Sequence, residues 1–403
     1  MPAHQPVTVV GAGLGGLTLA AVLHRNGIEA VLCDADPSPD ARPRGGMLDL
    51  REESGQTALR VAGLSEELRR IVRPGGEAMR VLDQHAGVRM EDGGDGDRPE
   101  VDPDDLRDLL LASLPPGAVR WGAEVTAAVP LDAGRYGVTL AGGESFTTDL
   151  LIGADGAWSK VRPLVSNAAP VYSGISFAET RLHDADARHP ECAELVGNGV
   201  MFALAEEKGL IAQRDGRGRL HVYVALKTPA EWAASGAVDF TDTAAAKAAL
   251  LEHFDGWDER LRALVAGADG PITPRPVHAL PVGHRWPRLP GVTLVGDAAH
   301  LMSPLAGEGA NLAMLDGAEL ASALAAHPGD PETALAVYEE ALFPRSEAAA
   351  AESATSLVMC FRPDAPRACW TSWRSTAPST APNARAGRRG GRTLEQAAEG
   401  AER

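Results

Sequence analysis

The sequence contains little cysteine and no long apolar run. Its 403 residues include four cysteines, which show neither CxxC spacing nor the density of a small secreted disulfide scaffold. We therefore expect free thiols in a cytoplasmic protein. No apolar run approaches the roughly 20 residues of a membrane-spanning helix, and the N-terminus lacks the basic stretch and apolar run of a signal peptide. We expect no membrane partner.

Positive charge is also scarce. The chain has 38 Lys and Arg against 55 Asp and Glu, a formal net charge of −17. Such an acidic surface repels phosphate, so we expect no nucleic-acid partner. His278, His284 and His300 are spread over different elements, and we expect no metal site. What the chain does have is 44% hydrophobic residues over a length that favours two or three structural units.

The first residues show the order strand, glycine turn, helix. The apolar residues 7–10 lead into GAGLGG, and residues 17–24 continue with helical apolar spacing. A second short strand ends at Asp34, where its carboxylate can accept hydrogen bonds from ribose hydroxyls. A glycine turn alone also occurs in structural roles, but this combination predicts dinucleotide binding, with phosphates facing the helix start. The turn residues concerned are Gly11, Gly13, Leu14 and Gly16.

Two later strands also end in aspartate. Residues 149–162, DLLIGADGAWSKVR, form an apolar strand that ends at Asp155 and is followed by a predicted helix. Residues 295–311, VGDAAHLMSPLAGEGAN, lead through Asp297 and a glycine-rich bend into a helix that runs to about residue 325. Because ligands bind outside the carboxyl ends of parallel strands, all three strand ends should face one site. The N–H groups at the last helix start could hold the pyrimidine edge of a flavin.

The middle of the chain changes to strand-like alternation. Residues 195–203, 210–214 and 220–226 read as strands of an antiparallel sheet, and helices follow at about residues 242–254 and 258–266. This sheet should cover an apolar pocket. The predicted fold is thus α/β: a Rossmann-like cofactor domain (residues 1–169 and 287–328), an inserted antiparallel-sheet substrate domain (170–286), a C-terminal bridging helix interrupted near Pro344 (329–363) and a disordered tail (364–403).

These motifs, in order and spacing, resemble those of the FAD-dependent aromatic hydroxylases, the flavoprotein monooxygenases of the p-hydroxybenzoate hydroxylase fold. The stretches RGGMLDLREESGQTALRVAGL, DPDDLRDLLLASL, ALKTPAEW and FDGWDERLRAL are similar to the tetracycline-inactivating branch, and the resemblance runs from about Val7 to about Asp364. It implies an FAD-containing monomer that uses NADPH or NADH and O₂. A flavin C4a-hydroperoxide would then hydroxylate an aromatic or polycyclic small molecule.

The resemblance also implies residue roles. Arg107 would reach FAD, Arg42 would serve the nicotinamide cofactor, Asp49 would line the flavin, and His221 would contact substrate. From the residues alone, Arg107 could be an exposed helix residue, Asp49 a turn residue and His221 a structural one. The predicted cofactor-binding residues are Gly11, Gly13, Leu14, Gly16, Asp34, Arg42, Asp49, Arg107, Asp155, Asp297, Gly307, Gly309 and Asn311. The predicted substrate contacts are Glu179, His221, Pro304 and Gly307.

The chain departs from the tetracycline-oxidising pattern at two places. Those proteins carry a substrate-gripping arginine where this chain has Gly199, and a glutamine where it has Glu179. Removing a cation and adding an anion changes which ligand fits, so another polycyclic or phenolic compound is as good a candidate as tetracycline. Two other readings stay open: an FAD-dependent reductase or dehydrogenase, and a flavoprotein that only sequesters ligand. We also hypothesise that the tail is a translated frameshift of a C-terminal helix.

Overall fold

The computed structural model describes residues 3–41, 46–94, 96–365 and 367. Its first sheet has the strand order β8-β2-β1-β11-β10-β9, with β17 paired to β11, and the core of this sheet is parallel. The two strands at the β9 edge are antiparallel. The strands are β1 (Ala3–Val10), β2 (Val31–Cys33), β8 (Val119–Arg120), β9 (Val125–Pro130), β10 (Tyr136–Leu140), β11 (Ser145–Gly153) and β17 (Val292–Leu294).

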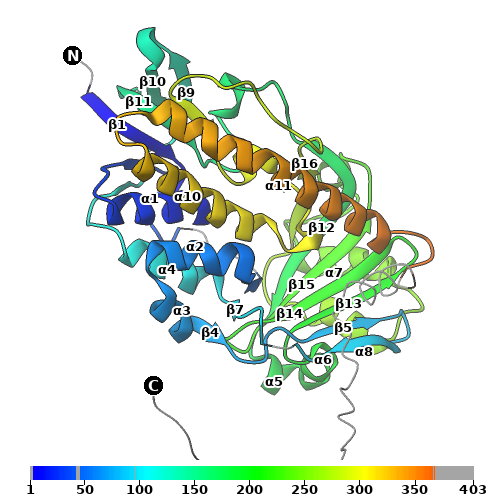
Figure 1. The fold of residues 1–403 in the computed structure, drawn as a ribbon. Coiled ribbons are helices and arrows are strands. Elements are labelled where there is room, and N and C mark those ends of the chain that lie inside the picture. Colours follow the sequence, from blue (N-terminus) through cyan, green and yellow to red (C-terminus); the bar gives the residue numbers. More distant parts are fainter. Residues whose placement is uncertain (1–2, 42–45, 95, 366, 368–403) are drawn as a thin grey trace, which may run out of the picture.

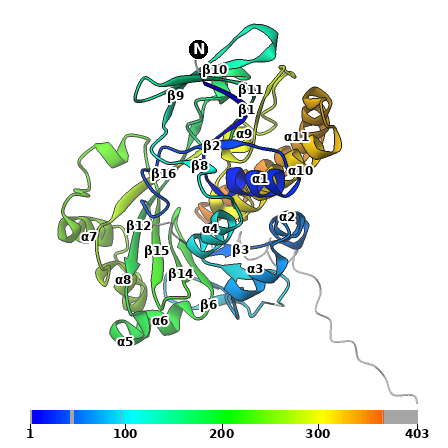
Figure 2. The same cartoon turned by 90° about the vertical axis from the view of Figure 1, so that its left-hand side faces the viewer.

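Two helices pack closely beside this sheet. These are α1 (Leu14–Arg25) and α10 (Gly309–Ala326), which lie next to each other in both views of the fold (Figures 1 and 2). A β-carbon on Gly317 would lie 2.4 Å from the Gly15 carbonyl oxygen, so small residues are what allow this approach. The helix α1 follows the glycine turn, and α10 follows the glycine-rich bend. Their packing therefore brings the two predicted halves of the site together.

A smaller layer lies beside these helices. Residues 52–56 form one π-helical turn that leads into α2. The three-stranded sheet has the order β3-β7-β4, and all its pairs are antiparallel. The elements of this layer are β3 (Leu48–Asp49), α2 (Thr57–Ala62), α3 (Ser65–Ile71), β4 (Val72–Arg73), β7 (Glu100–Val101) and α4 (Pro103–Ala112).

The second large sheet has the order β16-β12-β15-β14-β13-β5-β6 and is antiparallel except between β13 and β5. Helices cover one of its faces, on the outside of the molecule (Figure 2). The strands are β5 (Met79–Leu82), β6 (Val88–Asp92), β12 (Val171–Leu182), β13 (Val200–Ala205), β14 (Lys208–Arg214), β15 (Leu220–Lys227) and β16 (Thr273–Ala279). The helices are α5 (Ala185–Arg188), α6 (Pro190–Val196), α7 (Thr243–Glu252) and α8 (Glu259–Ala266).

The other face of this sheet carries an apolar cluster that we call the interdomain cluster. Alternate residues of β12, β14 and β15 point to it, and the end of α11 closes it. Its turn residue Leu305 comes from the glycine-rich bend. The members are Ile175, Phe177, Leu204, Ile211, Ala225, Val277, Leu357, Cys360, Phe361 and Ala365, with Val200, Phe202, Tyr223, Leu305 and Met359 packed against them.

The bridging helix is confirmed as α11 (Pro331–Cys360), about 45 Å long at 1.5 Å per residue. It crosses the molecule diagonally in Figure 1. Its first half buries Leu335 and Tyr338 in the core of the first sheet, and its end joins the interdomain cluster. The helix continues through Pro344 without the predicted interruption. Apart from Asp364, Ala365 and Arg367, the predicted tail lies outside the described residues, and so does its frameshift hypothesis.

Three sequence predictions need correction. Residues 195–203 do not form one strand, because Leu195 and Val196 bury one side of α6, and β13 begins at Val200. Residues 157–161 form a turn and a bend, and a single 3₁₀ turn, Arg162–Leu164, follows in place of the predicted helix. The strands β5 and β6, which fall within the predicted cofactor domain, belong to the second sheet because β5 pairs with β13. The two helices predicted near residues 242–254 and 258–266 are confirmed.

Candidate active site

The glycines of the turn have two different roles: at Gly11 and Gly16 the fold has no room for a side chain, whereas Gly13 borders open space. Gly11 has φ +106°, and a β-carbon there would lie 2.3 Å from the Ala154 carbonyl oxygen. A β-carbon on Gly16 would lie 2.1 Å from the Gly11 carbonyl oxygen. A β-carbon on Gly13 would meet no atom of the described chain within 4 Å. The first turn of α1, which starts at Leu14, contains no acidic residue. This open space lies in front of the N–H groups at the start of α1, where no acidic side chain would repel an anion, so it fits a pyrophosphate.

Asp34 lies at this turn, as predicted. Its Oδ2 accepts a hydrogen bond from the Ala12 N–H at 2.6 Å, and its Oδ1 accepts one from the Asp36 N–H at 2.8 Å. These bonds fix the carboxylate beside the glycine turn. Each carboxylate oxygen has a second lone pair, so Asp34 can also accept from a ligand hydroxyl.

Arg107 is buried on α4, which rules out the exposed-helix reading of this residue. Its side chain lies over the Trp121 ring at 5.0 Å, and its Nη1 donates to the Pro39 carbonyl oxygen. Its Nε and Nη2 atoms are buried and meet no hydrogen-bond partner among the residues that the structure describes. Buried donors without acceptors are costly, so this guanidinium fits a site at which a ligand supplies the acceptors.

The other two strand ends are joined by Arg162. This side chain is 3% exposed, and it donates from Nε to the Ala298 carbonyl oxygen at 2.7 Å and from Nη2 to the Asp297 carbonyl oxygen at 3.1 Å. Asp155 accepts a hydrogen bond from the Lys160 N–H at 2.6 Å. Burial raises the pKa of Asp155 above its ordinary value. Arg162 is therefore a brace between the loops after β11 and β17.

The loop after β17 brings Asp297 to the start of α10. The Asp297 Oδ1 atom lies 3.9 Å from the position of a β-carbon on Gly309. Gly307 has φ +68°, and a β-carbon there would lie 3.2 Å from Asp49 Oδ1. Burial raises the pKa of Asp297, and His300 and Arg162 oppose that shift. Two carboxylates thus flank the glycine-rich bend, where they could accept hydrogen bonds from hydroxyl or N–H groups of a ligand.

Asn311 organises this region through bonds within the protein. It is 1% exposed, and its amide bonds to the backbone of residues 49, 51 and 307. Sequence reasoning missed its neighbours Arg51 and Glu308, which form an ion pair, while Arg51 Nη2 donates to the Ala306 carbonyl oxygen at 2.7 Å. The pKa of Glu308 is raised overall, because burial raises it by more than the nearby Arg51 lowers it. Because Arg51 and Glu308 are more than 250 positions apart, no local sequence pattern could have predicted their contact.

Of the predicted substrate residues, Glu179 and His221 lie on the face of the second sheet that carries the interdomain cluster, whereas Pro304 and Gly307 lie in the glycine-rich bend after β17. Glu179 forms ion pairs with Arg275 at 3.0 Å and with Arg181 at 3.9 Å. His221 is 1% exposed and accepts a hydrogen bond at Nδ1 from the Gly46 N–H at 3.2 Å. Pro304 opens the short 3₁₀ turn that carries Leu305 into the cluster. The predicted Arg42 lies outside the described residues.

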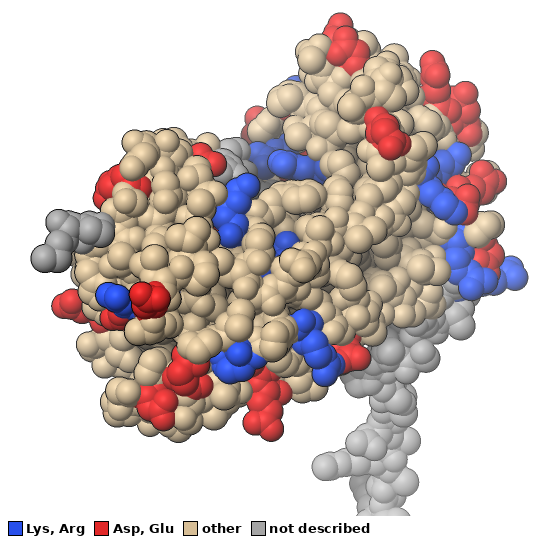
Figure 3. Space-filling model, turned by 90° about the horizontal axis from the view of Figure 1, so that it is seen from above, with Lys and Arg blue, Asp and Glu red and all other residues tan. Residues whose placement is uncertain are grey.

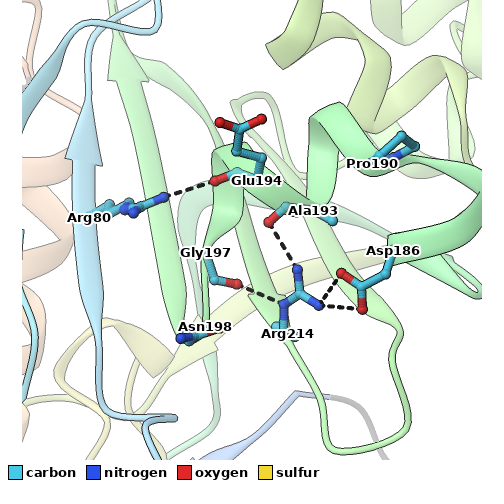
Figure 4. Close-up of a pocket in the computed structure, with 8 residues that line it drawn as sticks. All are labelled: Arg80, Asp186, Pro190, Ala193, Glu194, Gly197, Asn198 and Arg214. Carbon is cyan, nitrogen blue, oxygen red and sulfur yellow. Dashed lines mark hydrogen bonds and ion pairs between the residues drawn. The ribbon is translucent and has the colours of Figure 1, made fainter.

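Position 199 has no room for a side chain. A β-carbon on Gly199 would lie 1.9 Å from the Ala78 carbonyl oxygen, because β13 and β5 approach closely there. A hollow of about 370 Å³ lies next to it (Figure 4). Its two arginines are turned toward main-chain oxygens at the end of α6: Arg80 donates to Glu194 at 2.9 Å, and Arg214 donates to Ala193 at 2.9 Å. The arginines of this hollow thus stabilise the end of α6. None of the residues that line the hollow is a predicted cofactor or substrate residue.

None of the described helices combines the length and apolarity needed to cross a membrane. Within the same part of the chain, no group of three or more His, Cys, Asp or Glu side chains is placed to hold a metal ion. Cys33, Cys192 and Cys360 are buried, and Cys33 and Cys192 are free thiols.

A family model described as "FAD binding domain" matches residues 4–353. The chain belongs to this family. Among its curated relatives is the 3-amino-4-hydroxybenzoate 2-monooxygenase PtnB3 of Streptomyces platensis, 32% identical over 375 residues and 85% of each chain. The glycine turn, Asp34, Arg107 and the bend after Asp297 thus lie in a chain whose family fold is built around FAD.

Solved structures share the whole architecture. Klebsiella pneumoniae HpxO with FAD and uric acid has a TM-score of 0.76 at 22% identity and covers 92% of both chains. The tetracycline destructase Tet(51) has a TM-score of 0.69 at 18% identity, with 93% of this chain and 95% of that chain covered. These likenesses establish the fold: an FAD-binding domain, a separate sheet domain and a C-terminal helix. They do not choose between the substrates of those proteins.

Proposed function

We propose that this FAD-dependent monooxygenase hydroxylates an aromatic or polycyclic small molecule, using NADPH or NADH and O₂. The observation that supports it most directly is the position of the interdomain cluster. Leu305 belongs to this cluster and stands four residues before Gly309, where the proposed flavin edge would meet α10. An apolar surface would therefore adjoin the reactive ring, and exclusion of water from it would protect the oxygenating species.

The cofactor would be held by residues from three strand ends. The α1 N-terminus at Gly13 would take the pyrophosphate, Asp34 the ribose, and Arg107 acceptor atoms of the dinucleotide. Asp297 and the α10 N-terminus would face the ribitol and the flavin ring. When bound, FAD supplies hydride acceptance from the nicotinamide and activation of O₂ for transfer of one oxygen atom. No side chain of the site has to act as a nucleophile.

The side chains on the inner face of the second sheet support a substrate with a flat apolar body and one polar edge. Phe177 and Tyr223 lie 5.8 Å apart in the cluster and offer aromatic surfaces. Burial raises the pKa of Tyr223 to about 12, so its phenol stays neutral and can donate a hydrogen bond. Glu179, held by Arg275 and Arg181, supplies a charged edge on the same face. A phenolic or polycyclic ring system with hydroxyl groups has this character.

The charge distribution supports an anionic cosubstrate. Seen from above, the molecule is hollowed between two lobes, and Lys and Arg side chains border the hollow while many Asp and Glu lie farther out (Figure 3). A local basic border offsets the repulsion between a chain of net charge −17 and the phosphates of NADPH or NADH. We further propose that the protein acts as a monomer, which light scattering of the FAD-loaded protein tests.

The deciding experiment combines a visible spectrum with product analysis. FAD-loaded protein is supplied with NADPH or NADH under air and with a panel of tetracyclines and phenolic polyketides. The proposal expects a flavin spectrum, faster nicotinamide oxidation with one panel member, and a product heavier by one oxygen atom. Nicotinamide oxidation that yields only a reduced product would identify a reductase, and a dehydrogenated product formed without nicotinamide oxidation would identify a dehydrogenase. Tight ligand binding without turnover would identify a sequestering protein.

A further inference from the structure

Two side chains of the substrate sheet reach across to a segment that borders the proposed cofactor site. Gln213 on β14 accepts a hydrogen bond at Oε1 from the Met47 N–H at 2.8 Å. His221 on β15 accepts one at Nδ1 from the Gly46 N–H at 3.2 Å. Gln213 and His221 are register partners in neighbouring strands, so their side chains leave the sheet side by side. Consecutive N–H groups of the segment are therefore bound by adjacent side chains of the other domain.

The chemistry of His221 matches this role. Because Nδ1 accepts from Gly46, the ring carries its proton at Nε2, which lies 3.6 Å from Asp215 Oδ2. Burial by itself raises the pKa of Asp215, but hydrogen bonds from His221, Arg219 and backbone N–H groups lower it overall. Asp215 therefore stays ionised and favours the Nε2–H tautomer. Both ring nitrogens of this fully buried histidine are oriented within the protein.

Gln213 contacts a third element as well. Its Nε2 donates to Glu100 Oε1 at 3.3 Å and to the Met47 carbonyl oxygen at 3.4 Å. Glu100 on β7 stands opposite Asp49 in the small antiparallel sheet. The side-chain amide thus joins the substrate sheet, residues 46–49 and β7.

The far end of the segment is attached to the cofactor domain. The Asp49 carbonyl oxygen accepts a hydrogen bond from Asn311 Nδ2 at 2.8 Å, and Asp49 Oδ1 lies beside Gly307. Residues 46–49 therefore run from the substrate sheet to the start of α10 with a hydrogen-bonded attachment at each end. A shift of the sheet relative to α10 would pull on this segment.

We propose that Gln213 and His221 are positioning residues that form an interdomain latch on residues 46–49, and that this latch holds Asp49 in place for FAD. The link between the latch and FAD rests on the proposed function. The hydrogen bonds of the latch lie within the protein and do not depend on that function. It assigns His221 a task in addition to the substrate contact that the family resemblance implies. It also gives Gln213, which sequence reasoning did not single out, a role at the cofactor site.

The test measures hydrogen–deuterium exchange at the amides of Gly46 and Met47 in the FAD-loaded protein. A Gln213→Met variant keeps the side-chain length and removes both hydrogen-bonding atoms. We expect the Met47 amide to exchange about tenfold faster and the FAD dissociation constant to rise about tenfold, the effect of roughly one lost hydrogen bond on each. Gln84→Leu, at a half-buried turn residue outside this segment, is the control, and both values should stay at wild-type levels.

Other readouts separate a latch from general destabilisation. A Gln213→Glu variant keeps an acceptor for the Met47 N–H, so it should retain most of that amide's protection while losing the donor to Glu100. Equal loss in both Gln213 variants would overturn the latch. If Gln213→Met does not fold, unprotected Gly46 and Met47 amides in the wild-type protein would overturn it instead. Absence of FAD binding by the wild-type protein would refute the proposed function, and the Met47 amide would still report on the latch.

Discussion

Asn311 and Asp49 are joined by a hydrogen bond of 2.8 Å from Asn311 Nδ2 to the Asp49 carbonyl oxygen, across 262 positions of the chain. The same amide accepts the Arg51 N–H at its Oδ1 at 3.0 Å. One buried side chain thus holds both ends of the turn that follows β3. Through this contact, the start of α10 and the segment at the edge of the second sheet form one unit around the proposed flavin site.

Replacing Asn311 with leucine should weaken both the fold and the cofactor site. The substitution preserves volume but takes the Asn311 partner away from one backbone N–H and two carbonyl groups, which costs about 2–4 kcal/mol of unfolding free energy. FAD affinity should fall with it, because Asp49 loses its anchor. Denaturant unfolding and a flavin fluorescence titration measure the two effects. Asn198→Leu, at an exposed position, is the control; equal values for the two variants would contradict this role.

Gly11 and Gly13 should respond differently to alanine. Gly11→Ala places a β-carbon 2.3 Å from the Ala154 carbonyl oxygen at a φ of +106°, so unfolding free energy should fall by at least about 2 kcal/mol. Gly13→Ala meets no atom of the described chain within 4 Å and should change stability by less than about 1 kcal/mol. Its FAD dissociation constant should nevertheless rise at least about tenfold, because the methyl group would occupy phosphate space. Unchanged FAD affinity in Gly13→Ala would place the phosphates elsewhere.

Glu100 should make stability depend on pH. Burial, opposed by Gln213 and Arg73 and reinforced by Asp49 and Glu77, raises its pKa from 4.5 to about 8. The folded state therefore holds the proton more tightly than the unfolded state, and this contribution to stability is lost as pH rises from about 4.5 through about 8. Glu100→Gln removes the effect.

The measurement compares Glu100→Gln with the wild-type protein in denaturant at about pH 5 and about pH 9. The variant should gain roughly 2–4 kcal/mol relative to wild type between these values, since other titrations cancel in the difference. Glu29→Gln, at an exposed position, should give a flat difference. A flat difference for Glu100→Gln as well would show that this carboxyl titrates normally.

Introducing at position 199 the arginine of the tetracycline-oxidising proteins should destabilise the fold without creating tetracycline turnover. A β-carbon there would lie 1.9 Å from the Ala78 carbonyl oxygen, so Gly199→Arg must separate β13 from β5. We expect a loss of unfolding free energy of at least about 2 kcal/mol and no gain in tetracycline turnover. A stable variant with raised tetracycline oxidation would show that the backbone there adapts to a side chain.

The sequence predicted the parts of the site that depend on local chemistry. Gly11, Asp34 and Asp297 stand at strand ends, where turn geometry and parallel pairing make their position readable from neighbouring residues. The brace by Arg162 and the Gln213–Glu100 contact depend on pairings between distant segments, so no local sequence pattern predicts them. The π-helical turn at residues 52–56 was not predicted either. Leu195 and Val196 were misread because a short apolar run suits a buried strand and a buried helix face equally well. The parallel β5–β13 pairing was missed for the same reason as the distant contacts.

Oxygen incorporation under isotopically labelled O₂ is the measurement that decides whether this protein is a hydroxylase. FAD-loaded protein, NADPH and the panel member that most accelerates nicotinamide oxidation are incubated, and the product is analysed by mass spectrometry. We predict a product that contains one oxygen atom derived from O₂ for each NADPH used in coupled turnover. Stoichiometric H₂O₂ with no labelled product from any panel member, or oxygen derived from water, would contradict it.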